Sequence, residues 1–121
     1  MVNETKKIWD CEDVEIAATC IRVPVMRAHA ESINLSFKSE LDEDKAREIL
    51  SKAEGVTIID DRENNRFPTP LDASDNDDVY VGRIRRDISQ EGNTGLEIFI
   101  CGDQIKKGAA LNAVQIAELL L

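Results

Sequence analysis

The closing segment of the chain, residues 102–121, constrains its packing more than any other part of the sequence. Alanine and large aliphatic residues recur there at helical spacing, which predicts a helix. They fall on several sides of that helix: Ala110, Leu111, Val114, Ile116, Ala117, Leu119, Leu120 and Leu121. A helix that is apolar on most sides must be buried on most sides, and one small sheet covers only one of them. We therefore expect a further surface to pack against it.

The size and charge of the chain exclude several classes of protein. With 121 residues, 42% of them hydrophobic, the chain suffices for one globular domain and leaves no room for a separate cofactor domain. The net charge of −9 argues against a nucleic-acid partner, and the short basic run 83–86 fits a solvated or salt-bridged strand face. Because no run reaches the roughly 18 apolar residues of a membrane span and no secretory leader opens the chain, we predict a cytoplasmic protein without a membrane partner.

The cysteines Cys11, Cys20 and Cys101 indicate neither a disulfide framework nor a metal site. Their number is odd, and no two form a C-x-x-C pair. Only one histidine is available to join them as a zinc ligand. We therefore expect reduced thiols and no metal. Cys20 lies in an alternating apolar pattern, which predicts a small buried side chain rather than a nucleophile.

The remaining patterns predict an α+β fold. Residues 2–9 have the pattern of a helix end, and residues 42–53 form the clearest helix, with an acidic first turn and Gly55 as its C-cap. Apolar patterns predict strands at residues 14–22, 29–37, 56–59, 79–88 and 96–101. The last two form an antiparallel hairpin, whereas residues 60–78 are irregular and fit a functional or partner-packed loop. The expected architecture is a largely antiparallel sheet with helices packed on it.

Residues 19–31 concentrate the side chains best suited to chemistry, including the only histidine, His29. Histidine titrates near neutral pH and serves as an acid or a base, and an arginine such as Arg22 binds a carboxylate through two parallel hydrogen bonds. Taken alone, His29 also fits a surface or structural role, and Arg22 fits a strand-edge ion pair. Arg27 fits either a second anion contact or a solvated side chain.

The strand predicted at residues 29–37 separates its polar end from its apolar end. Ile33 and Leu35 alternate on the same face as His29 and Glu31. If the apolar pair is buried, the two polar residues lie at the open end of the strand. Glu31 then either orients His29 or forms part of a polar rim.

Five blocks in this order resemble the carboxy-terminal part of bacterial aspartate-semialdehyde dehydrogenases. They are RVPV at 22–25, HAE at 29–31, FPTP at 67–70, DVYVGRIR at 78–85 and GAALNAVQIA at 108–117. The resemblance extends from Val2 to Leu121. It implies part of a glyceraldehyde-3-phosphate dehydrogenase-like catalytic and dimerisation domain, with residues 1–121 as a carboxy-terminal fragment and the cofactor-binding domain absent.

The resemblance also implies an activity and roles for three residues. Enzymes of this family use NADPH to reduce aspartyl phosphate to aspartate semialdehyde and phosphate, in the biosynthesis of lysine, diaminopimelate, methionine and threonine. In these homodimers a cysteine attacks the acyl phosphate. His29 matches the family's acid/base histidine, and Arg22 matches the arginine that holds the substrate carboxylate. Asn112 matches a position near the nicotinamide of NADP, although the small residues 108–110 before it fit helix packing equally well.

Some parts of the family's machinery have no counterpart in the sequence. No glycine-rich phosphate-binding turn occurs, and the segments with the nucleophilic cysteine and a lysine-bearing helix are absent. We therefore expect a fragment without turnover of its own. Two other hypotheses stay open: a non-catalytic module that self-associates through its sheet and closing helix, and a small thiol hydrolase that uses Cys20 with His29.

Overall fold

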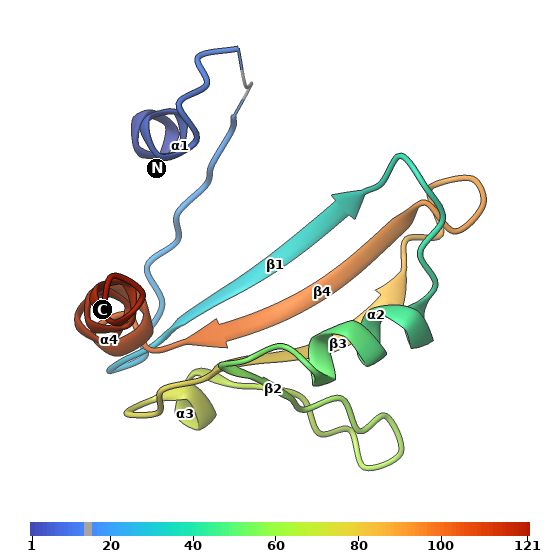
Figure 1. Ribbon diagram of the computed structural model, residues 1–121. Coiled ribbons are helices and arrows are strands. Elements are labelled where there is room, and N and C mark those ends of the chain that lie inside the picture. The colour runs from blue at the N-terminus through green and yellow to red at the C-terminus, as the bar shows by residue number, and fades with distance from the viewer. Residues whose placement is uncertain (14–15) are drawn as a thin grey trace.

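The computed structural model of the protein describes residues 1–13 and 16–121 (Figure 1). Its elements follow in the order α1 (Val2–Trp9), β1 (His29–Ser36), α2 (Glu43–Ser51), β2 (Val56–Ile58), α3 (Pro70–Ala73), β3 (Val79–Arg86), β4 (Gly95–Gly102), the π-helix η1 (Lys106–Ala110) and α4 (Leu111–Glu118). Four of the five predicted strands and the helix at the amino-terminal end are thereby confirmed.

The strands form one sheet in the order β1-β4-β3-β2. β4 pairs with both β1 and β3 in antiparallel fashion, whereas β2 runs parallel to β3. Along its whole length β1 lies beside β4, from His29 opposite Gly102 to Ser36 opposite Gly95. The predicted α+β fold with a largely antiparallel sheet is therefore confirmed.

The two faces of the sheet are covered by different helices. On one face Ala46 of α2 packs with Val81, Ile84 and Leu96, which are almost completely buried. On the other face Ala73 of α3 joins a second cluster with Cys101. Because neighbouring strand residues point to opposite faces, these two clusters lie on either side of the same strands. The sheet thus has a core of its own.

α2 matches the predicted helix except at its end. Asp42 is the N-cap, and its carboxylate accepts a hydrogen bond of 2.7 Å from the backbone N–H of Lys45. The helix ends at Ser51, so the prediction that Gly55 caps it is wrong. Gly55 instead has a φ of 71° in the turn before β2, a left-handed conformation that glycine adopts without steric cost.

The stretch 60–78 contains more regular structure than its sequence pattern predicted. Asp61 and Arg66 form an antiparallel bridge, and α3 follows it. A capping box starts α3: the Thr69 hydroxyl accepts from the N–H of Asp72, and the Asp72 carboxylate accepts from the N–H of Thr69. The local signal was present in the sequence, but it is short and lies among many polar residues.

The strand predicted at residues 14–22 is not formed where the structure describes it. Residues 14 and 15 lie outside the described residues, and residues 16–22 belong to no helix or strand. An alternating pattern favours a strand only if a neighbouring strand supplies the ladder of hydrogen bonds. The described part of the chain provides none for this segment. Cys20 is consequently exposed, which corrects the prediction that it is buried.

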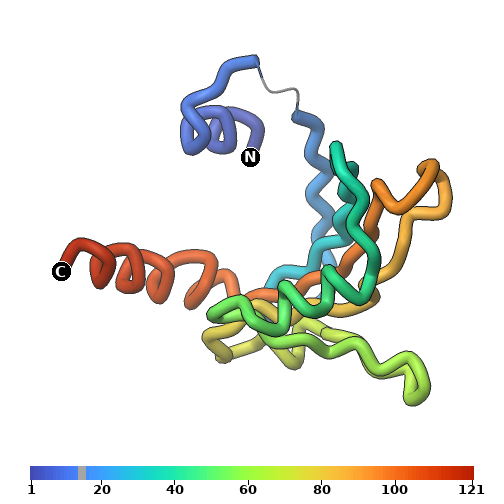
Figure 2. The backbone as a smooth tube through the Cα atoms, turned by 45° about the vertical axis from the view of Figure 1, so that its right-hand side comes forward, coloured from blue at the N-terminus to red at the C-terminus, as the bar shows by residue number. Residues whose placement is uncertain are grey.

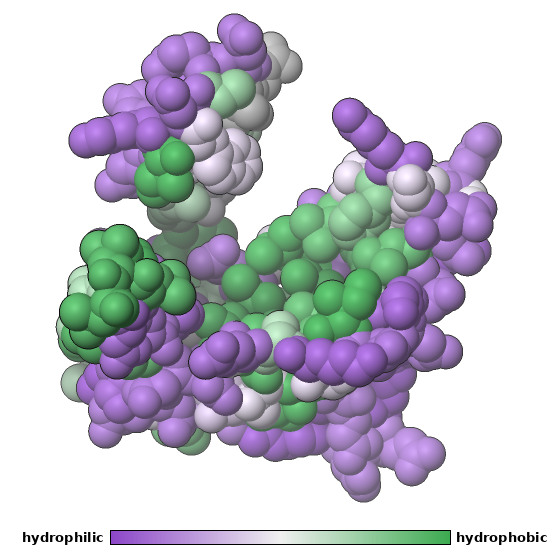
Figure 3. Space-filling view, viewed as in Figure 1, coloured by the Kyte–Doolittle hydropathy of each residue, from purple (hydrophilic) through white to green (hydrophobic). Residues whose placement is uncertain are grey.

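The helices nearest the two termini bury no residue, and Figure 2 shows α4 projecting from the sheet. The closing helix begins at Lys106 rather than at residue 102. No described part of the chain supplies the further surface that was expected to bury it. Ile116 is 55% exposed and Leu120 is 84% exposed. Figure 3 shows hydrophobic residues gathered on α4 and on the adjacent face of the sheet. Among the described helices, none has both the length and the apolar character needed to cross a membrane.

Candidate functional site

His29 is the first residue of β1, and its side chain is exposed at the end of the strand. Glu31 is exposed as well, while Ile33 and Leu35 farther along the same face are half-buried. This gradient agrees with the alternation of the sequence. Because the residue opposite His29 is Gly102, the neighbouring strand places no side chain beside the imidazole at that register position. The imidazole is therefore open to a ligand.

The two residues before His29 are held firmly although they belong to no regular element. Ala28 is 5% exposed and has a φ of 76°, in the left-handed region that alanine rarely adopts. Its backbone N–H donates a hydrogen bond of 2.5 Å to Oε1 of Gln104. Beside it, Nε of Arg27 lies 2.5 Å from Oδ2 of Asp103. The position of His29 is thus set by contacts with the segment that follows β4.

Asp103, which follows β4 directly, is completely buried. Its carboxylate accepts hydrogen bonds from the backbone N–H groups of Asp75 at 2.8 Å, Ile105 at 2.8 Å and Lys106 at 3.0 Å. Burial acts to raise the pKa of this carboxyl. The N–H donors and the guanidinium of Arg27 outweigh burial and hold the pKa well below its usual range. Asp103 is therefore a buried anion with a full set of partners.

Arg22 and Asn112 are exposed, on two different segments of the chain. Arg22 lies in the extended stretch that leads to β1, seven residues before His29. Asn112 is the second residue of α4, after the exposed small residues 108–110. In the described structure no hydrogen bond or ion pair joins Arg22, His29 and Asn112 to one another. The structure therefore presents these three side chains separately.

The three cysteines are free and differ in their surroundings. Cys101 is completely buried, and burial, together with the charge of Asp72, raises the pKa of its thiol to about 11. A thiol in this state is a poor nucleophile. The exposed Sγ of Cys20 lies 3.3 Å from Sδ of Met1. That contact is with another sulfur rather than with the imidazole that a thiol hydrolase needs.

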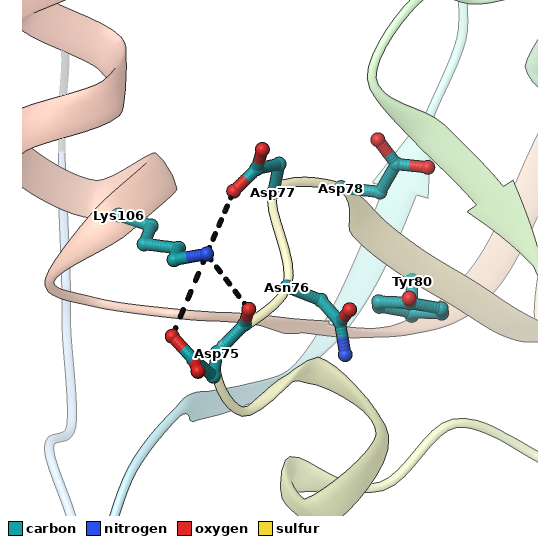
Figure 4. A pocket seen from close by; sticks show the side chains of 6 residues that line it. All are labelled: Asp75, Asn76, Asp77, Asp78, Tyr80 and Lys106. Carbon is teal, nitrogen blue, oxygen red and sulfur yellow. Dashed lines mark hydrogen bonds and ion pairs between the residues drawn. The ribbon is translucent and has the colours of Figure 1, made fainter.

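A polar pocket of about 300 Å³ lies where η1 meets the loop before β3 (Figure 4). Its acidic groups already have partners: Nζ of Lys106 is 3.0 Å from Oδ1 of Asp77 and 3.5 Å from Oδ1 of Asp75, and Asp78 accepts a hydrogen bond from Thr57. Within residues 1–13 and 16–121 no group of three or more metal-ligating side chains is gathered to hold an ion. The pocket is an ion-pair cluster beside the start of η1.

The sequence of the chain matches a known family over most of its length. The profile of the semialdehyde dehydrogenase dimerisation domain matches residues 1–107. The chain belongs to the semialdehyde dehydrogenase family. This agrees with the resemblance found in the sequence, and it assigns the sheet described above to the dimerisation domain of that family.

Individual relatives of this semialdehyde dehydrogenase chain agree with the family match. The aspartate-semialdehyde dehydrogenase of Synechocystis sp. is 55% identical over 121 residues, which are 100% of this chain and 35% of the relative. That of Prochlorococcus marinus is 54% identical over the same shares. The crystal structure of aspartate semialdehyde dehydrogenase II from Vibrio cholerae complexed with ASA has 39% identity and a TM-score of 0.85, covering 99% of this chain and 34% of that one. The chain thus spans about a third of the length of the relatives it matches.

The structure also identifies residues around His29 that the sequence did not single out. Arg27 was expected to bind an anion or to lie in solvent, but it pairs with the protein's own Asp103. The partners Asp103 and Gln104 were not recognised at all. Asp103 does have a local signal, since an aspartate just before a helix is a typical capping residue. Its contact with Arg27 has no such signal, because the two residues are far apart in the chain.

Proposed function

We propose that the chain is the part of an NADP-dependent aspartate-semialdehyde dehydrogenase that carries the acid/base histidine and the substrate-binding arginine. The observation that carries this proposal is the 55% identity to the aspartate-semialdehyde dehydrogenase of Synechocystis sp. across all 121 residues, in a chain whose His29 and Arg22 are both exposed. The chain aligns with 35% of that relative. We assign the nucleophilic cysteine and the cofactor-binding domain to the remainder of the enzyme.

His29 is assigned the proton transfers of the reaction. It takes the proton of the attacking thiol, whose sulfur then bonds to the acyl carbon of aspartyl phosphate while the carbon–oxygen bond to phosphate breaks. The nicotinamide, when bound, supplies the hydride that reduces the resulting thioester. As the carbon–sulfur bond then breaks and the aldehyde leaves, the imidazolium returns its proton to the departing thiolate, which regenerates the thiol. An exposed imidazole at the end of a sheet strand suits both transfers.

Arg22 is assigned to the carboxylate of the substrate. A guanidinium binds a carboxylate through two parallel hydrogen bonds, which fix its orientation as well as its position. The exposed side chain of Arg22 is available for such a ligand. Holding the substrate at this end keeps its reacting carbon within reach of the cysteine and of His29.

The residues of the closing segment fit one end of NADP. Asn112 offers an exposed carboxamide at the start of α4, and the exposed small residues 108–110 allow a flat ring to approach closely. We assign Asn112 to the nicotinamide end of the cofactor. The chain has no glycine-rich turn for the phosphates of NADP, so most of the cofactor belongs to the remainder of the enzyme.

The family to which the chain belongs is named for dimerisation, and we propose a homodimer. The apolar surfaces of α1 and α4, on which no described residue is buried, favour an extensive contact with other protein surface. This feature also supports a second candidate function, a self-associating module without chemistry when the chain occurs alone. The three free cysteines support the predicted cytoplasmic location.

A hybrid enzyme tests the proposal. The aligned third of the Synechocystis relative is replaced by this chain, and the phosphate-dependent, NADP-linked oxidation of aspartate semialdehyde is measured. We expect activity in the hybrid enzyme and none in the 121-residue chain alone. An inactive but folded hybrid, or turnover by the isolated chain, overturns the assignment. Light scattering on the isolated chain tests the second candidate, for which a stable monomer is the contrary result.

A further inference from the structure

We propose that Asp103 is a positioning residue for the reaction, because its single carboxylate fixes both the strand that carries His29 and the helix that carries Asn112. This inference rests on the proposed roles of His29 and Asn112. Neither the match to the family nor the relatives assign a role to Asp103, and the side chain is too deeply buried to touch a substrate. Its effect on the reaction has to pass through the segments that it joins.

One oxygen of the carboxylate acts on the His29 side. Oδ2 of Asp103 faces Nε of Arg27 at 2.5 Å and accepts from the N–H of Asp75 at 2.8 Å. The next residue on each segment adds a second connection, since Gln104 accepts a hydrogen bond from the N–H of Ala28. Ala28 keeps its unusual φ of 76° under these two restraints. The backbone therefore enters β1 in one orientation, and that orientation directs the side chain of His29.

The other oxygen acts on the cofactor side. Oδ1 of Asp103 accepts from the N–H groups of Ile105 and Lys106, which begin η1. The backbone carbonyl of the same residue accepts from the N–H of Gly108 at 3.0 Å. η1 continues directly into α4, where Asn112 is the second residue. Two oxygens of one residue thus tie the His29 strand and the Asn112 helix to a common point.

An asparagine cannot replace this carboxylate. It would supply one oxygen, and its NH₂ group would face hydrogen-bond donors on the other side. Either the N–H of Asp75 or the N–H groups at the start of η1 then lose their acceptor, and Arg27 loses its ionic partner. The sequence provides a matched control in Asp87, which is 7% exposed at the opposite end of the β1–β4 pair. Asp87 also accepts several hydrogen bonds, from Asn34, Ser89 and Gln90.

The decisive measurement uses the only histidine of the chain as a probe. In the 121-residue protein the imidazole carbon–proton NMR signal belongs to His29 alone. We expect Asp103→Asn to shift or broaden this signal, and Asp87→Asn to leave it unchanged. If Asp103→Asn does not fold by circular dichroism, Arg27→Gln takes its place, because it removes the ion pair that joins Asp103 to the segment before His29. An unchanged signal in the folded variant overturns the inference.

Kinetics in the hybrid enzyme separate positioning from general stability. Misplacing a catalytic group by about 1 Å costs on the order of 100-fold in rate, so we expect Asp103→Asn to lower kcat by roughly 10- to 100-fold with KM changed less than about threefold. Asp87→Asn should change kcat less than about twofold. Equal losses in both variants contradict a positioning role. If His29→Ala leaves turnover intact, the proposed function fails, while the NMR result still judges the contacts of Asp103.

Discussion

The two ends of the β1–β4 pair are built in similar ways and differ in what they leave exposed. Each end has a buried carboxylate whose pKa lies well below its usual range, Asp87 at one end and Asp103 at the other. Near Asp87, Leu96 of β4 belongs to the core beneath α2. Near Asp103 the strand instead presents His29 to solvent. A buried, ionised carboxylate therefore supports packing at one end and an open polar surface at the other.

The partners of the two carboxylates explain this difference. Asp87 binds its own turn through Ser89 and Gln90, which are two and three residues away, and it reaches only Asn34 on β1. Asp103 binds backbone groups and a guanidinium from three separate segments. At the Asp87 end, the carboxylate stabilises the turn of a single hairpin. The Asp103 end is a junction of distant segments, and such a junction is what a site made from several segments requires.

The largest expected difference between the two ends concerns chemistry. His29→Ala in the hybrid enzyme should lower kcat by about 10²- to 10⁴-fold, the usual contribution of a general acid or base. Because the side chain is exposed, the free energy of unfolding should change by less than about 0.5 kcal/mol. Steady-state kinetics and thermal unfolding check the two values. Asn34→Ala at the Asp87 end serves as the control. An equal loss of kcat in that variant would contradict the expected difference between the two ends.

The next effect concerns stability at the Asp87 end. Leu96→Ala should destabilise the fold by about 2–5 kcal/mol, because Leu96 is 2% exposed in the main core cluster and truncation leaves a cavity. The matched variant Leu120→Ala removes the same atoms from an 84% exposed position just after α4 and should cost less than about 0.5 kcal/mol in the isolated chain. Urea unfolding of both variants measures this. Similar costs would mean that α4 is packed in solution.

A smaller effect is expected for Arg22. Arg22→Ala in the hybrid enzyme should raise KM for aspartate semialdehyde by roughly 10- to 100-fold, through loss of a charge-assisted hydrogen-bond pair. Arg22→Lys should recover only part of this, because an ammonium group does not reproduce the two parallel bonds. An unchanged KM in both variants contradicts a substrate contact. Arg86→Ala, an exposed arginine near the Asp87 end, is the control.

The smallest effect is the acid dependence of stability. The folded pKa of Asp87 lies below the ordinary value because its carboxylate accepts hydrogen bonds from Asn34, from the Ser89 side chain and N–H, and from Gln90. The ionised group therefore stabilises the fold above about pH 4, the unfolded pKa, and this contribution is lost as the pH falls toward the folded pKa. Thermal unfolding between about pH 5 and pH 2 should show a shallower decline in Asp87→Asn than in the unsubstituted chain. Parallel curves would refute the linkage.

Sequence patterns predicted the elements whose apolar residues repeat on one side with the period of a strand or a helix. β1 and α2 were recognised from alternation and helical spacing, because in each the less exposed residues lie on one side. Residues 16–22 show the same kind of alternation without a strand, since a pattern of side chains does not supply a neighbour for the backbone. The exposure of Cys20 follows from the same fact.

The candidate site was predictable only in part. The exposure of His29 could be predicted, because the apolar residues of β1 lie at the opposite end of the strand. The support beneath it could not, because Arg27 and Asp103 meet across most of the chain and nothing local to either residue indicates the other. The left-handed φ of Ala28 was also unpredictable, since alanine carries no preference for that conformation.

The order of strands in the sheet has a consequence for how the protein assembles. β3 and β4 are joined by the short connection 87–94, whereas residues 37–94 separate β1 from its neighbour β4. Closing a longer loop costs more entropy, so local pairs form before distant ones. We expect the β3–β4 hairpin to form early and β1 to dock late. In hydrogen exchange the β1 amides should be the less protected, and a chain that opens from this edge loses His29 from the sheet while keeping its hairpin.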